Sequence, residues 1–68
     1  MVGRVMNWRM LELELDGAMQ RLRYRVIGQV MEVETRFGRR RLPAGPLRAE
    51  VTAANVLRQM ARRVAQAA

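Results

Sequence analysis

The sequence Met-Gln-Arg-Leu-Arg-Tyr-Arg-Val-Ile, residues 19–27, decides the fold of this chain. Its arginines alternate with leucine, tyrosine and valine, which is the period-two pattern of a β-strand with one buried face. Glutamates alternate with apolar residues in the same way before it, over 11–15, and after it, over 31–34. An arginine strand between two glutamate strands favours a sheet in which opposite charges face each other across neighbouring strands.

The turn between the first two strands is marked by Asp16 and Gly17, a dipeptide typical of two-residue hairpin loops. A loop of that length places one of the two glutamates opposite a methionine. A four-residue loop over 16–19 places both glutamates opposite arginines, and each such cross-strand pair contributes about 0.2–1 kcal/mol. We therefore predict the longer loop. It gives the following pairs: Leu13 with Leu22, Leu11 with Tyr24, Glu14 with Arg21, and Glu12 with Arg23.

The second turn falls at Gly28 and Gln29. A two-residue loop here makes both faces of the hairpin consistent, and a slip of one residue would move every apolar side chain to the wrong face. We expect the third strand to run over 30–37. The predicted pairs are Ile27 with Val30, Arg25 with Glu32, Tyr24 with Val33, and Arg23 with Glu34.

The rest of the chain changes character at Gly38. Residues 38–46 contain two prolines and two glycines, which is typical of turns. Residues 47–51 alternate again and fit either a short fourth strand or a loop. From Thr52, a suitable N-cap residue, apolar side chains recur at the period of a helix, which we expect over 52–67.

These patterns predict an α+β fold: an antiparallel meander of three or four strands, with one C-terminal α-helix packed on its apolar face. A chain of 68 residues suits one small domain. We divide it into an arm over 1–7, the meander over 8–37, a basic segment with the optional fourth strand over 38–51, and the helix over 52–67.

Catalysis is not expected from this composition. The chain has no histidine, no cysteine and a single aspartate, so it lacks the usual groups for acid–base, nucleophilic or metal chemistry. The glutamates are expected to pair with arginines, which lowers the pKa of a carboxyl group and makes it a poor general acid. We expect no enzyme activity, no metal, no cofactor and no small-molecule substrate.

The net charge of +7 favours a polyanionic partner. All 13 basic residues are arginines, and four of them are predicted to be balanced by four glutamates on the outer face of the sheet. The balanced arginines are Arg21, Arg23, Arg25 and Arg36. The remaining nine arginines are offset by only two acidic residues, Asp16 and Glu50, and so account for the whole net charge of +7. Seven of the nine follow Gly38, and we predict that they bind nucleic acid through its phosphates. They are Arg39, Arg40, Arg41, Arg48, Arg58, Arg62 and Arg63.

Trp8, Met10 and Met19 share the outer face and form a second candidate site, an apolar surface for a partner. The leading interpretation is a small non-enzymatic protein that binds DNA or RNA. The alternative is a protein–protein or self-assembly module, a homodimer or higher oligomer such as a subunit of a phage-like or mobile-element assembly.

We expect a cytoplasmic location and no membrane partner. The sequence shows no signal-peptide pattern. Its uncharged runs fall far short of the roughly 20 residues that a membrane span needs.

Overall fold

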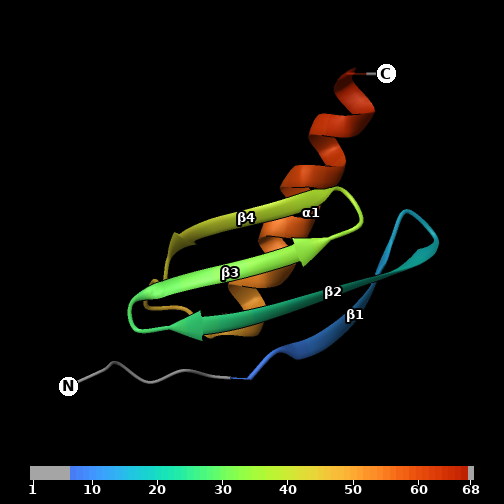
Figure 1. Cartoon of the computed structure of the whole chain (residues 1–68). Coiled ribbons are helices and arrows are strands. Elements are labelled where there is room, and N and C mark those ends of the chain that lie inside the picture. The colour runs from blue at the N-terminus through green and yellow to red at the C-terminus, as the bar shows by residue number, and fades with distance from the viewer. Residues whose placement is uncertain (1–6, 68) are drawn as a thin grey trace.

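A computed structural model describes residues 7–67 as a two-layer structure, a four-stranded antiparallel sheet with a helix on one face (Figure 1). The strands follow one another in the order β1-β2-β3-β4, which confirms the predicted α+β meander with a C-terminal helix. The arm expected over 1–7 lies outside the described residues except for Asn7. The elements are β1 (Arg9–Leu15), β2 (Ala18–Ile27), β3 (Val30–Thr35), β4 (Gly38–Pro43) and α1 (Ala49–Ala67).

The register between β2 and β3 is the predicted one. Arg25 lies opposite Glu32 and Arg23 lies opposite Glu34. Gly28 has a φ of 62°, a value that favours glycine and suits the two-residue turn. Side-chain alternation and turn chemistry agree here, so a single register satisfies both.

The register between β1 and β2 differs from the prediction. The loop has two residues, and Glu12 lies opposite Arg21 while Glu14 lies opposite Met19. The reason lies in the turn itself, because Asp16 and Gly17 both have positive φ, as the favoured two-residue hairpin turn requires. This backbone preference outweighs one charged pair. Because the two registers differ by two residues, the inner and outer faces of β1 are unchanged.

A fourth strand exists, but it lies over 38–43 and not over the predicted 47–51. β3 ends at Thr35, two residues before the predicted end, and the chain turns at once into β4. The expected basic loop is therefore largely a strand. The alternation of polar and apolar residues that marks a strand is missing from its sequence. Arg40 faces the helix side, where an apolar residue is expected, and donates a hydrogen bond to Gln59.

The helix begins at Ala49, three residues before the predicted start. The backbone N–H groups of Val51 and Thr52 both donate to the carbonyl oxygen of Arg48, which is therefore the capping residue. Val51 is exposed on the polar side of the first turn. The first turn does not follow the apolar pattern of the later ones, and for that reason the sequence pattern placed the start too late.

The core lies between the inner face of the sheet and the first three turns of α1. Its buried side chains are Leu22, Tyr24, Met31 and Val33 from the sheet, and Ala53, Val56, Leu57 and Met60 from the helix. Beyond Met60 the helix leaves the buried core and extends past β4 (Figure 1), and Val64 is 49% exposed. This projecting segment, residues 61–67, is the part of the helix that the core does not use.

The first turn gives a direct test of what sets the β1–β2 register. Replacing Gly17, whose φ is 80°, with alanine places a Cβ in a backbone region that disfavours it. We expect Gly17→Ala to lower the free energy of unfolding by about 1 kcal/mol or more, measured by urea denaturation. Gly45→Ala is the matched control, since Gly45 has open space around it and an ordinary φ. Equal costs for the two variants would contradict this account.

Candidate nucleic-acid interface

The outer face of the sheet is organised around Glu32 in the middle of β3. Glu32 is only 8% exposed, although it is charged. Arg25 on β2 donates from Nε to its Oε1 at 2.7 Å, and the Nε of Arg41 on β4 lies 3.4 Å from its Oε2. A buried carboxylate needs such compensation on both oxygens, because an unpaired buried charge is strongly destabilising. Arg25 and Arg41 are therefore committed to Glu32.

Glu34, two residues further along β3, repeats the arrangement. Its Oε1 accepts a hydrogen bond from Arg23 Nε at 2.6 Å, and the guanidinium of Arg39 on β4 forms an ion pair with Oε2. The hydrogen bond from Arg23, assisted by Arg39, lowers the pKa of Glu34 below its ordinary value against the opposing effect of burial. Arg39 thus joins the sheet as a partner of Glu34.

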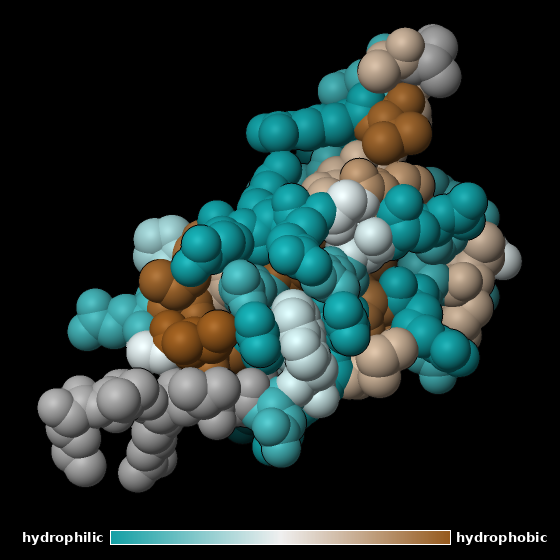
Figure 2. Space-filling view, viewed as in Figure 1, coloured by the Kyte–Doolittle hydropathy of each residue, from teal (hydrophilic) through white to brown (hydrophobic). Residues whose placement is uncertain are grey.

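The outer face as a whole is close to electrical balance. Five arginines meet four glutamates on it, and hydrophilic side chains cover most of the face in view (Figure 2). The edge pair of Arg21 with Glu12, at 3.2 Å, is exposed and contributes little to stability. Arg36 was predicted to belong to this face. It lies instead in the β3–β4 turn, with its guanidinium carbon 5.5 Å from the centroid of the Phe37 ring.

The predicted partner surface is only partly assembled. The guanidinium carbons of Arg23 and Arg25 both lie 4.4 Å from the centroid of the half-buried Trp8 ring. These contacts hold the ring on the sheet by cation–π attraction. Met10 is its neighbour on the same face of the chain, whereas Met19 lies two rows further along the sheet, next to the first turn. Trp8 and Met10 are thus brought together, and Met19 stands apart.

The seven arginines predicted to bind nucleic acid do not form one patch. Arg39 and Arg41 belong to the outer face, where they pair with glutamates. Arg48 lies at the N-terminal end of α1, with its Nη1 4.0 Å from an oxygen of Glu50. Arg40 lies on the helix side of β4, hydrogen-bonded to Gln59 at 3.1 Å. The three arginines within the helix neither belong to the sheet nor form an ion pair with a carboxylate among residues 7–67.

These three, Arg58, Arg62 and Arg63, are called the helix arginines below. All are exposed, and within residues 7–67 none of them forms an ion pair with a carboxylate. Arg58 donates to Asn55 on the preceding turn at 3.1 Å, a contact that leaves the other guanidinium N–H groups available. Two of the three lie on the segment that projects past β4.

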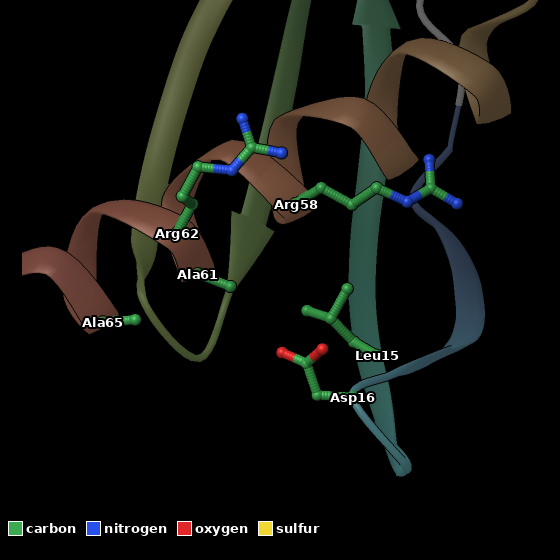
Figure 3. Close-up of a pocket in the computed structure, with 6 residues that line it drawn as sticks. All are labelled: Leu15, Asp16, Arg58, Ala61, Arg62 and Ala65. Atoms are coloured by element: carbon green, nitrogen blue, oxygen red, sulfur yellow. The ribbon is translucent and has the colours of Figure 1, made fainter.

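A shallow hollow of about 280 Å³ separates the helix from the first hairpin turn (Figure 3). Leu15 and the small side chains of Ala61 and Ala65 line it, and Arg58 and Arg62 lie on its helix side. Asp16 directs its carboxylate from the turn toward the helix without forming an ion pair in the described part of the chain. Ala61 and Ala65 lie one turn apart on the same face of the helix, and their side chains are too small to fill this space.

Gln59 was not predicted to belong to the site, although it joins the helix to β4 through Arg40. One feature of the sequence could have identified Gln59: it precedes Arg63 by four residues, so both side chains lie on one side of the helix. Arg40 and Arg63 are therefore expected to lie on the same flank of α1.

Comparison with family models, with curated proteins and with solved structures gave no match to this chain. Over residues 7–67, α1 lacks the apolar length needed to cross a bilayer. In the same part of the chain, acidic side chains nowhere gather in a group suited to a metal ion.

The lowered pKa of Glu34 gives stability a defined pH dependence. A carboxyl group whose pKa is lowered by folding contributes stability above its unfolded pKa, near 4.5, and loses it as the pH falls through the folded value. We expect Glu34→Gln to be clearly less stable than the parent near pH 7. The difference should shrink as the pH falls below 4.5 and through the lowered folded-state pKa, as measured by urea denaturation.

Glu14→Gln is the matched control, because Glu14 lies on the same face without an ion pair among residues 7–67. Glu14→Gln should change the free energy of unfolding only slightly, both near pH 7 and in acid. If the loss in free energy of unfolding caused by Glu34→Gln does not shrink on acidification, the arginines do not stabilise the charged form of Glu34.

Proposed function

We propose that this protein is a non-enzymatic nucleic-acid-binding module that contacts phosphates through the helix arginines. The observation that carries the proposal is the exposure of Arg58, Arg62 and Arg63 on one segment of α1, without carboxylate partners among the described residues. No acidic residue occurs in the sequence after Glu50, so nothing on this part of the helix offsets their charge.

The chemistry of arginine supports a phosphate ligand. A guanidinium group presents several N–H donors in a planar fork that matches two oxygens of a phosphate. Release of the counterions condensed on nucleic acid then makes binding favourable and strongly dependent on salt. The projecting segment of α1 extends beyond β4 (Figure 1), and Arg62 and Arg63 are exposed on it.

The proposal narrows the predicted set of binding residues. Arg39 and Arg41 are left out because a phosphate would have to compete with the shielded carboxylates of Glu34 and Glu32. Arg40 is retained as a secondary contact beside the helix, since its partner Gln59 is neutral. Arg48 is left out because it lies at the opposite end of the helix.

A binding role without catalysis is part of the same proposal. It is supported by the absence of histidine and cysteine from the chain, and by the lowered pKa of Glu34, which makes that carboxyl group a poor proton donor. A cytoplasmic location is also proposed, because a chain without cysteine has no need of an oxidising compartment.

The test is a salt titration of binding to fluorescent single-stranded and duplex oligonucleotides. Changing all three helix arginines to glutamine should weaken binding on the order of tenfold or more at low salt. The slope of log K against log salt concentration should also fall in magnitude by about 2 to 3, one phosphate contact for each lost arginine.

The matched control carries the same loss of charge on the outer face of the sheet, as Arg21→Gln, Arg39→Gln and Arg41→Gln. Circular dichroism establishes that both variants are folded. The control should keep most of the salt slope of the parent. Equal losses from the two triple variants would show that net charge alone drives binding. A parent protein that binds neither oligonucleotide at low salt would refute the proposal.

A further inference from the structure

Both edges of the sheet are open within residues 7–67, since β1 and β4 each pair with only one neighbour. In an antiparallel sheet, successive residues direct their backbone groups alternately toward and away from a given neighbour. The two-residue turns after Leu15 and Ile27 fix that alternation, because the residues flanking such a turn bond to each other. Glu12 and Glu14 therefore direct their backbone groups outward from β1, and Arg39 and Arg41 do so from β4.

The side chains at these outward positions carry opposite charges at the two edges. The β1 edge presents Glu12 and Glu14, and the β4 edge presents Arg39 and Arg41. Pairing two β1 edges would place glutamate beside glutamate, and pairing two β4 edges would place arginine beside arginine. Like charges directly opposite each other destabilise a strand pair, whereas opposite charges stabilise it. Charge therefore disfavours pairing of β1 with β1 or of β4 with β4, and favours pairing of β1 with β4.

We propose that β4 of one copy of this chain pairs with β1 of a second copy, in antiparallel fashion, and extends the sheet from subunit to subunit. The register sets Glu14 opposite Arg39 and Glu12 opposite Arg41. Both rows of charges alternate across the junction itself. In the first row, Arg25, Glu32 and Arg41 of one copy are followed by Glu12 and Arg21 of the next. The second row runs through Glu34 and Arg39 to Glu14 of the next copy, where Met19 ends it.

The same register is consistent on the helix side of the sheet. It places Leu11 opposite Leu42, and these are half-buried side chains at the two edges that pack only partly against the core of their own subunit. It also places Leu15 opposite Gly38, which has no side chain of its own, and Leu13 opposite Arg40, whose guanidinium is turned toward Gln59 on the helix. Each junction would remove apolar surface from water as well as pair backbone groups.

The proposed contact joins two different surfaces, so it cannot close on itself in a pair of subunits. Assembly through such a contact gives a ring or an open filament, never a two-fold dimer. This inference does not depend on nucleic-acid binding, because neither the helix arginines nor a ligand takes part in the junction.

The test blocks one edge at a time with proline, which removes an outward N–H while leaving the internal ladder intact. Glu12→Pro blocks the β1 edge and Arg41→Pro blocks the β4 edge. By light scattering, the parent should exceed the mass of a dimer as its concentration rises, and each variant alone should be a monomer. An equimolar mixture of the two variants should form a dimer and nothing larger, because one free β4 edge meets one free β1 edge.

Each other outcome overturns the proposal. A parent that stays monomeric up to about 1 mM has no useful edge affinity. A blocked variant that dimerises alone pairs like edges. A mixture of folded variants that remains monomeric lacks the proposed junction.

Glu12→Gln and Arg41→Gln keep the backbone donors and are the matched controls, which should still assemble. Should a proline variant fail to fold, Glu14→Arg tests the same junction without loss of an ion pair among the described residues. It should weaken association on the order of tenfold by setting arginine against Arg39, and unchanged association would refute the register.

Discussion

Two carboxylates in the middle of a small sheet impose the main constraint on this structure. Glu32 and Glu34 are shielded from water on β3, and a shielded charge is tolerated only where donors and opposite charges surround it. Arginines must therefore stand on both sides, from β2 and from β4. That need fixes the position of β3 between two basic strands and the register of each. The apolar side chains opposite the glutamates are then committed to the face that the helix covers.

The sequence predicts those parts of the fold in which several local signals agree. At the β2–β3 hairpin, the charges, the apolar alternation and the glycine turn all give one register. At the β1–β2 hairpin the charge pairs favour the longer loop and the Asp16–Gly17 dipeptide favours the shorter one. The apolar alternation could not choose between them, because a shift of two residues leaves both faces intact. The backbone demands of Asp16 and Gly17 decided it. β4 escaped prediction because Arg40 interrupts its alternation, and its long stem reaches the helix in a way that no residue-type pattern encodes.

The candidate site was predicted in composition but not in arrangement. The sequence located the excess positive charge after Gly38, yet it could not tell arginines held by glutamates from arginines left free, since that depends on where the fourth strand runs. Once β4 is in place, Arg39 and Arg41 serve the sheet. The helix arginines are left without a carboxylate partner among residues 7–67. The pairing of the strands therefore separates two groups of arginines. Those on the sheet compensate the glutamates, and those on the helix are the ones that we propose contact a ligand.

The meander order of the sheet also has a kinetic meaning. Every strand pairs with the one that directly follows it in the chain, across turns of two residues. Such contacts close short loops, which cost little entropy, and proteins rich in them fold quickly. Within residues 7–67, the docking of α1 onto β1, β2 and β3 joins the more distant parts of the chain. The hairpins can form while the chain is still being synthesised, and the helix, which follows them in the chain, then completes the core.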